Sequence, residues 1–436
     1  MKYAITTLGC KVNQYETQAV ETLLRERGHA PTAAGDADVV IVNTCAVTAE
    51  SGRKSRQAIR RLQGENPGAA TVVCGCFSQI SPEEVRALGA DLVFGSDRRE
   101  EMVEAIETLL ARREGQGRLF LDEPRKRRDF EELPAGAVAG RTRAMLKIQD
   151  GCDNFCTYCI IPYSRGRVRS LPAARAAAQA AALAAEGYRE IVVTGIEIAS
   201  YGKDLPGRPG LAEVMEAIAA AAPGLRLRLG SLEPTVVTED FCSRLAALGT
   251  VCGQFHLSLQ SGCDRTLAAM GRKYDTAAFL AAAERLRRNF PGCALTADLI
   301  VGFPGETEAD HAETLAFLRK VGFASMHVFP YSIRPGTRAA AMAGQLTRGV
   351  KNARAASARA VVEETRRCYL ESCLGKTLSV LFETERDGLC VGHGENGVQV
   401  SANRGQLRGL VKNVKIQGIQ GEMLVGNIVA IPDSPC

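Results

Sequence analysis

The chain has 436 residues, of which 46% are hydrophobic and 24% charged, and its net charge at pH 7 is +5. At about 150 residues per domain, this length predicts two to four domains with sizeable cores. No stretch reaches the roughly 18 to 20 apolar residues of a membrane span, and MKYAITTLGC lacks the basic start and apolar run of a secretory signal, so we expect a cytoplasmic protein without a membrane partner.

Residues 1–115 alternate strand and helix patterns, which predicts an α/β domain with a parallel βαβ sheet. The expected elements are, in order, YAITTL, an amphipathic helix near 14–27, ADVVIVNT, a basic helix near 50–63, ATVVCGC and DLVFG. Cysteines follow three of these strands, at the position where open α/β sheets build their sites.

The rest of the chain divides into three parts. Residues 116–140 are charged without a clear period and are expected to form a linker or a wrapped hairpin. Residues 141–371 repeat βα units, including AMLKIQ, EIVVTG and ALTADLIVG, which predicts a full or partial TIM-like barrel. Residues 372–436 change to short alternating strands punctuated by Gly and Asn, which is typical of a small OB-like β-barrel.

Fifteen cysteines are spread over CxxC, CxC and single positions. In a reducing compartment this scatter predicts metal ligands and buried thiols rather than a disulfide framework.

The loop GCDNFCTYC places Cys152, Cys156 and Cys159 in a CxxxCxxC spacing. A four-iron cubane is usually bound by four thiolates, so three leave one iron open to a small molecule. A closed zinc site would need a fourth ligand close by, and the following residues supply none.

Cys10, Cys45 and Cys76 form a second set of three, each after a predicted strand. If the fold brings them together, they would again leave one iron of a cubane uncovered, ready to hold sulfur. Taken alone, they are as well explained as small buried hydrophobes. Cys74 stands two positions before Cys76, and we expect only Cys76, which ends the strand, to be a ligand.

CxxxCxxC is the signature of radical SAM enzymes, and with the second triad the chain resembles the methylthiotransferases from end to end. The motifs that carry the resemblance are TLGCKVNQYET, VNTC, GCFSQ, KIQDGCDNFCTYCIIPYSRGRVRS, TGIEIASYG, HLSLQSGCDRTLAAMGRKY, DLIVGFPGETE and FPYSIRPGTRA. The resemblance implies an N-terminal cluster domain, a radical SAM barrel, a C-terminal TRAM domain, two 4Fe-4S clusters and S-adenosyl-L-methionine (SAM).

The start TLGCKVN followed by YET resembles the branch that acts on threonylcarbamoyladenosine in tRNA. The isopentenyladenosine branch more often starts like YGCQMN, and the branch that acts on an aspartate of a ribosomal protein starts like LGCPKN. These two activities remain the alternatives within the family, and a zinc-containing RNA-binding protein is the alternative outside it. The implied partners are the anticodon arm of tRNA and a flavodoxin- or ferredoxin-like electron donor.

The resemblance also implies what the two clusters do. The open iron of the first cluster chelates SAM, whose cleavage yields a 5′-deoxyadenosyl radical, and the second cluster delivers sulfur. The C2–H of adenine is neither acidic nor electrophilic, so acid–base groups cannot activate it at neutral pH, whereas a radical can.

Five residues are expected to contact SAM. Tyr158 stands where the superfamily has an aromatic residue beside the adenine, and Gly195 and Glu197 stand near the position of the amino group. TGIEIASYG departs from the commoner family pattern at Glu197, and Gly195 serves a tight turn equally well. Ser258 and Gln260 share one face by alternation, which predicts that they face the barrel lumen and the SAM ribose.

Basic residues supply the expected RNA contacts. His256 has the parity of the lumen-facing pair, but we expect it to be a core histidine. Residues 51–61 carry five positive charges and no negative one. Arg165, Arg167 and Arg169 either hold RNA phosphate or close the cluster loop through ion pairs. On the C-terminal barrel, an acid-free stretch predicts RNA binding, with a solvated face as the alternative; it contains Arg404, Arg408, Lys412 and Lys415.

Overall fold

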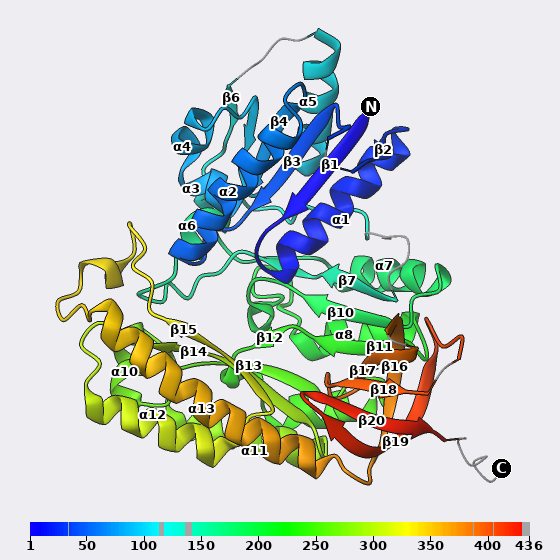
Figure 1. Ribbon diagram of the computed structural model, residues 1–436, viewed down its shortest axis with the longest axis vertical. Helices are drawn as coiled ribbons and strands as arrows, with labels where there is room; N and C mark the ends of the chain where they lie inside the picture. Colours follow the sequence, from blue (N-terminus) through cyan, green and yellow to red (C-terminus); the bar gives the residue numbers. More distant parts are fainter. Residues whose placement is uncertain (34, 113–116, 136–141, 387, 404, 430–436) are drawn as a thin grey trace.

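The structure, a computed structural model, describes residues 1–436 except 34, 113–116, 136–141, 387, 404 and 430–436. An N-terminal α/β sheet, a central barrel and a small C-terminal barrel follow one another along the chain (Figure 1). This α/β class and this order confirm the prediction from the sequence. None of the helices in the described ranges is long and apolar enough to cross a membrane.

The N-terminal sheet has six parallel strands in the order β2-β1-β3-β4-β5-β6. Its strands are β1 (Lys2–Thr7), β2 (Ala30–Pro31), β3 (Val39–Thr44), β4 (Ala70–Gly75), β5 (Leu92–Phe94) and β6 (Arg118–Phe120). Its helices are α1 (Lys11–Glu26), α2 (Ala49–Glu65), α3 (Cys76–Ile80), α4 (Pro82–Ala87) and α5 (Arg99–Arg112). Every residue of β3 is buried because α1 and α5 cover one face of the sheet, and α2, α3 and α4 cover the other.

The sheet extends beyond residue 115 into the segment expected to be a linker. Strand β6 pairs with β5, and the Phe120 ring stacks on Phe94 with centroids 4.4 Å apart. Farther along, after the short 3-10 helix η1 (Pro124–Lys126), Leu133 is buried in the core beneath α1 and α5. These single apolar residues anchor the segment without a sequence period, and period is the signal from which the sequence predicts elements.

The central barrel consists of parallel strands in two adjoining sheets, ordered β11-β10-β7 and β12-β13-β14-β15. The strands are β7 (Arg143–Lys147), β10 (Glu190–Thr194), β11 (Arg226–Leu229), β12 (Ser231–Leu232), β13 (Gln254–Gln260), β14 (Ala294–Val301) and β15 (Ser325–Pro330). The outer helices are α7 (Ala173–Ala185), α8 (Leu211–Ala221), α9 (Glu239–Ala247), α10 (Asp264–Met270), α11 (Thr276–Asn289), α12 (Glu308–Val321) and α13 (Arg348–Ser372). Within the described residues β7 and β15 do not pair, so the barrel is partial, as predicted.

The inside of this barrel is not packed solid. Along β13 and β14 the residues that face the helices are buried, whereas those that face inward are only half-buried. A complete TIM barrel fills its interior with layers of bulky side chains. Here the inward side chains are mostly polar, among them His256 and Asp298, so the lumen can admit a ligand.

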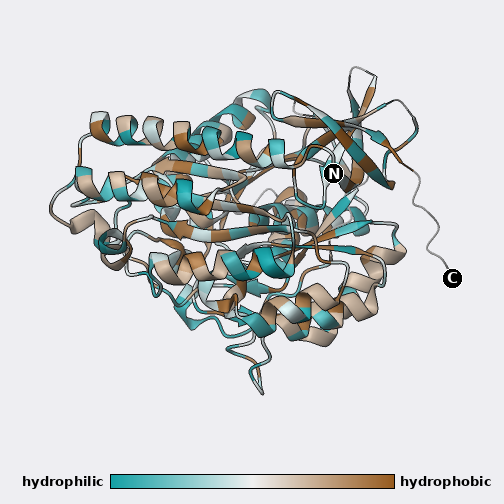
Figure 2. Ribbon diagram, turned by 90° about the horizontal axis from the view of Figure 1, so that it is seen from below, coloured by the Kyte–Doolittle hydropathy of each residue, from teal (hydrophilic) through white to brown (hydrophobic). Residues whose placement is uncertain are grey.

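The C-terminal region is a closed five-stranded barrel in the order β16-β17-β18-β20-β19. Its strands are β16 (Thr377–Arg386), β17 (Leu389–Gly394), β18 (Gln399–Ala402), β19 (Val411–Gln420) and β20 (Met423–Ile428). It stands against the amino ends of the central strands, where Arg226 and Arg228 donate hydrogen bonds to its backbone carbonyls. Figure 2 shows it at the upper right, beside the central barrel.

Candidate active site

The three N-terminal cysteines lie at one edge of the sheet. β1, β3 and β4 pair in parallel, so their carboxyl ends meet there, and Cys10, Cys45 and Cys76 follow those ends. Burial raises the pKa of the Cys10 thiol to about 11, against the opposing charge of Arg165. Cys76 and Cys45 are close enough to add to the same pKa rise. The tertiary structure therefore brings the three thiols together.

Two glycines make this approach possible, and each directly precedes a cysteine of the triad. Gly9 and Gly75 have φ of +106° and +103°, which favours glycine over any other residue. A Cβ on Gly9 would lie 2.8 Å from the Cβ of Cys45 and 2.9 Å from its Sγ. A Cβ on Gly75 would lie 2.5 Å from Oδ1 of Asn43. A side chain at either position would therefore push the strand ends apart.

The second triad lies in the loop between β8 (Gln149–Asp150) and α6 (Ile161–Arg165). The Cys159 N–H donates to the Cys156 carbonyl at 3.0 Å, which folds the loop back on itself. Burial raises the pKa of Cys152, and Cys159 and Cys156 add to that rise. Three mutually close, buried sulfurs suit a cubane with one open iron, and a bound metal would hold them deprotonated.

The two triads face each other across the boundary between the N-terminal sheet and the central barrel. Burial raises the pKa of Cys159 to about 12, and Cys76 of the other triad adds to that rise. Arg165 lies between them: its Nε donates to Cys76 Sγ at 3.3 Å and its Nη1 to Asp150 Oδ2 at 3.1 Å. Asp150 is two residues before Cys152, so the guanidinium contacts one triad directly and reaches the loop of the other through Asp150.

A fully buried ion network holds this boundary together, and the sequence does not reveal it. The Glu16 carboxylate on α1 pairs with Arg165 at 2.6 Å, with Arg99 at 3.0 Å and with Lys147 at 3.2 Å. Burial alone would raise the pKa of Glu16, but these three positive charges hold that pKa well below its ordinary value. Because the network joins α1, α5, β7 and α6, it fixes the N-terminal sheet on the barrel.

The donor geometry also bears on the zinc alternative. Among the described residues, no three or more His, Cys, Asp or Glu side chains are arranged to hold a metal ion. A structural zinc ion needs ligands about 2.0 to 2.3 Å from one centre. A cubane spreads its thiolates around a larger body than a single ion, so three neighbouring thiols without a fourth ligand in the loop suit a cluster.

Arg272 supports the loop triad from the barrel side. Its Nη1 donates to Cys156 Sγ at 3.1 Å, and its Nη2 pairs with Glu233 at 2.8 Å. The loop is also tied to α10, since the Thr157 N–H donates to the Met270 carbonyl at 2.9 Å. Each triad therefore has one buried arginine against one sulfur, which can counter the negative charge of a thiolate-bound cluster.

Three of the expected SAM contacts lie beside the loop triad. The half-buried ring of Tyr158 meets Phe303 edge-on at 6.4 Å. At Gly195, an added Cβ would lie 2.8 Å from the Gln149 carbonyl, so close packing requires the glycine. The Glu197 carboxylate accepts from the Ala199 N–H at 3.0 Å and caps a short 3-10 helix, a local role that the sequence does not show.

Ser258 and Gln260 face the lumen, as alternation along β13 predicts. Gln260 has φ of +66°, which is rare for a residue with a side chain and coincides with an irregular register against β14. Such strain is often found at ligand sites. The assignment of these side chains and of Tyr158, Gly195 and Glu197 to SAM stays a prediction.

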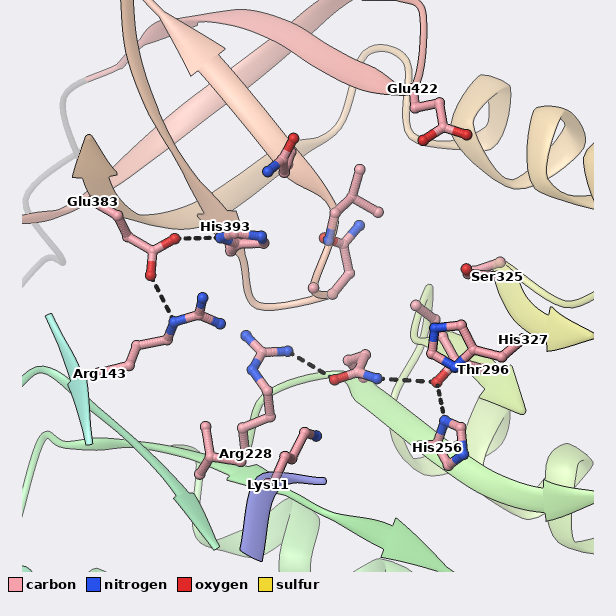
Figure 3. A pocket seen from close by; sticks show the side chains of 18 of the residues that line it. Lys11, Arg143, Arg228, His256, Thr296, Ser325, His327, Glu383, His393 and Glu422 are labelled. Atoms are coloured by element: carbon pink, nitrogen blue, oxygen red, sulfur yellow. Dashed lines mark hydrogen bonds and ion pairs between the residues drawn. The ribbon is translucent and has the colours of Figure 1, made fainter. Parts of the chain in front are cut away.

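A cavity of about 960 Å³ occupies the lumen at the amino ends of the central strands, under the C-terminal barrel (Figure 3). The six cluster cysteines are not among its lining residues, but Lys11, directly after Cys10, is. Burial, Arg228 and Arg143 lower the pKa of Lys11. His256 also lines this cavity, with Nδ1 3.2 Å from Thr296 Oγ1, so our expectation of a core histidine is wrong.

The candidate RNA contacts divide into three groups. Lys412 and Lys415 are exposed on β19, and Arg408 lines the rim of the cavity, whereas Arg404 lies outside the described residues. Arg165 and Arg169 are buried and belong to ion pairs, which decides between the two roles left open for them. In the basic helix α2, Arg53, Arg56 and Arg61 each pair with a glutamate.

Fold and site together define a class: an α/β enzyme with a three-cysteine loop at the mouth of a partial barrel. Residues 146–318 match the model of the Radical SAM superfamily, and residues 2–95 match that of Uncharacterized protein family UPF0004. A solved radical SAM methyltransferase, TsrM from Kitasatospora setae, shares the fold with a TM-score of 0.55 at 15% identity, covering 78% of this chain and 74% of its own.

Proteins with similar sequences show which radical SAM enzymes this chain belongs with. The Threonylcarbamoyladenosine tRNA methylthiotransferase MtaB of Bacillus subtilis is 39% identical over 91% of this chain and 89% of its own length. The tRNA-2-methylthio-N(6)-dimethylallyladenosine synthase of Oleidesulfovibrio alaskensis is 36% identical over 93% of this chain and 88% of its own. The chain therefore belongs to the radical SAM methylthiotransferases that modify tRNA, enzymes that use SAM and two 4Fe-4S clusters.

Proposed function

We propose that this enzyme methylthiolates C2 of N6-threonylcarbamoyladenosine next to the anticodon of tRNA. The observation that carries the proposal is the placement of two three-cysteine donor sets on opposite sides of Arg165, beside a polar lumen. When bound, the clusters and SAM supply radical cleavage of a C–H bond and a source of sulfur, which acid–base groups cannot supply.

The chain's own residues divide this work. Cys152, Cys156 and Cys159 would hold the cluster that binds SAM, and Cys10, Cys45 and Cys76 would hold the sulfur-transfer cluster. Tyr158, Gly195, Glu197, Ser258 and Gln260 would position SAM. The reductant would be a flavodoxin- or ferredoxin-like protein.

The C-terminal barrel would bind the anticodon arm. Its exposed Lys412 and Lys415 on β19 and Arg408, which lines the cavity, supply the positive charge for this contact. Arg404 belongs to the same sequence stretch. A base that is splayed out of an anticodon loop can enter a pocket, which is the usual mode of recognition for single-stranded RNA.

The choice of threonylcarbamoyladenosine over isopentenyladenosine rests on the 39% identity to the Bacillus subtilis protein and on the TLGCKVN start. Mass spectrometry of tRNA nucleosides tests it in a strain that lacks this protein. We expect the methylthio group to disappear from threonylcarbamoyladenosine alone and to return with the plasmid-borne gene. Its disappearance from isopentenyladenosine instead would contradict the substrate assignment.

A further inference from the structure

One cation in the lumen has no partner. In the described part of the chain, the Lys11 ammonium makes neither a hydrogen bond nor an ion pair, and its exposed side chain lines the cavity. Figure 3 shows it extending from the start of α1 into the space near Arg228 and His256, with no interaction drawn to it. A positive charge without an ion-pair partner at the wall of a cavity attracts an anionic occupant.

Three other cations that line the cavity are already paired with acids. Arg143 pairs with Glu383 at 2.6 Å, Arg228 pairs with the buried Glu190 at 2.7 Å, and Arg366 pairs with Glu422 at 3.0 Å. These pairs leave the positive charge of Lys11 uncompensated.

Asp298, an acid on the barrel wall whose charge acts on Lys11, is also engaged. Asp298 lies 3.5 Å from His256 Nε2 and 3.1 Å from His327 Nδ1. Burial would raise its pKa, but hydrogen bonds from these two histidines hold the pKa of Asp298 well below its ordinary value. The carboxylate is therefore engaged by the histidines, and Asp298 and Glu190 act on Lys11 at a distance, without an ion pair.

The position of Lys11 relates this charge to the reaction. It follows Cys10, so its Cα lies about 3.8 Å from that of a proposed ligand of the sulfur-transfer cluster. The cavity volume, about 960 Å³, is within the range of pockets that enclose small ligands and is large enough for a modified nucleoside. A threonylcarbamoyl group carries one carboxylate, whereas an isopentenyl group carries no charge.

We propose that the Lys11 ammonium binds the carboxylate of the threonylcarbamoyl substituent and thereby selects the substrate and orients its base toward the cysteine triads. This inference rests on the proposed function and assigns its specificity to one residue. A charge-assisted hydrogen bond of this kind typically corresponds to about 10- to 100-fold in affinity.

The test is a double-mutant cycle on the holoenzyme, measured as RNA binding without reductant so that no turnover occurs. The probes are two anticodon stem-loop RNAs, one with threonylcarbamoyladenosine and one with its neutral methylamide. The proteins are wild type, Lys11→Gln and the charge-retaining Lys11→Arg. We expect wild type to prefer the carboxylate RNA by about 10- to 100-fold, Lys11→Gln to bind both equally and Lys11→Arg to keep part of the preference.

Iron content and the absorption spectrum of each variant serve as controls for the clusters. Equal preference in wild type, or an unchanged preference in Lys11→Gln, would overturn the role of Lys11. Loss of iron from Lys11→Gln with no change in discrimination would also overturn it, because Lys11 would then serve the cluster.

A separate turnover assay of wild type with threonylcarbamoyladenosine and isopentenyladenosine RNAs tests the proposed function itself. Product from the isopentenyladenosine RNA alone would refute that function whatever the variants show.

Discussion

The two cysteine triads contain the same donor atoms but are assembled by different means. Cys152, Cys156 and Cys159 come from one loop, so their proximity follows from spacing along the chain. Cys10, Cys45 and Cys76 come from three strand ends and meet only because β1, β3 and β4 pair in parallel register. The difference teaches that the first site is a local property of the sequence, whereas the second is a property of the sheet.

The strongest way to break this comparison is to remove one ligand from each triad. We expect Cys152→Ala to abolish both SAM cleavage and the methylthio product, and Cys10→Ala to abolish the product while SAM cleavage continues. Product should fall by at least about 1,000-fold in both, since each proposed cluster is required. Chromatography of 5′-deoxyadenosine and of the modified nucleoside measures the two steps, and iron content should halve in each variant. Normal product from Cys10→Ala with its second cluster rebuilt would remove the sulfur-donor role.

Arg165 tests how the two triads are held together, because it contacts Cys76 of one triad and Asp150 beside the loop of the other. Arg165→Met would leave Glu16 and Asp150 buried without one of their main counter-charges, so we expect unfolding to become easier by about 3 to 5 kcal/mol. Denaturant titration measures this change. Arg288→Met is the control: it removes an exposed arginine paired with Glu239 and should leave stability unchanged. Equal midpoints for the two variants would contradict a structural role for the network.

A substitution at Gly75 should affect the triad built by the sheet and leave the triad built by the loop intact. Gly75→Ala would place a Cβ against the carbonyl of Thr44 at φ +103°, so we expect about 3 kcal/mol of destabilisation and loss of iron from the second cluster only. Gly28→Ala is matched, since Gly28 has φ of +80° but open space around it, and it should lose about 1 kcal/mol with full iron content. Both cluster signals falling together would show that the triads are not independent.

Acid should lower the stability of the wild-type protein more than that of a variant in which Glu16 carries no charge. The pKa of Glu16 is lowered on folding, so its contribution is complete above the unfolded value of about 4.3 and is lost as pH falls below it. We therefore expect the free energy of unfolding to decline below pH 4.5 more steeply in wild type than in Glu16→Gln. Parallel pH profiles would contradict the assigned charge network.

The smallest effect concerns the surface far from both triads. Neutralising Lys412 and Lys415 to Gln should weaken tRNA binding several-fold and reduce its salt dependence by about one unit of slope per lost phosphate contact. Both side chains are exposed on β19, so folding should be unaffected. Binding titrations at several salt concentrations measure the slope, and an unchanged slope would exclude this face of the barrel from the RNA contact.

Much of the site follows from short patterns in the sequence. The choice of Cys76 over Cys74 followed from its place at the end of a strand: β4 ends at Gly75, whose φ of +103° turns the chain into α3, so Cys76 lies on the other side of the sheet from Cys74. Alternation along β13 places Ser258 and Gln260 in the lumen. It also places His256 in the lumen, where the structure has it, although we expected a core histidine; parity shows which face a residue is on but not whether that face is filled.

Other parts of the site have no local pattern at all. Glu16 meets Arg99 and Arg165, which are 83 and 149 positions away in the chain, so spacing does not indicate either pair. The unpaired charge of Lys11 is equally hidden, because it depends on which acids other arginines already occupy.

The sequence by itself determined the strands, the order of the three regions and the residue types that can hold clusters, because these depend on hydrophobic period and on side-chain chemistry. Only the tertiary structure decided which cysteines meet, which charges are paired and that the lumen stays open. Those properties depend on strand register and on the burial of residues that are distant in the chain.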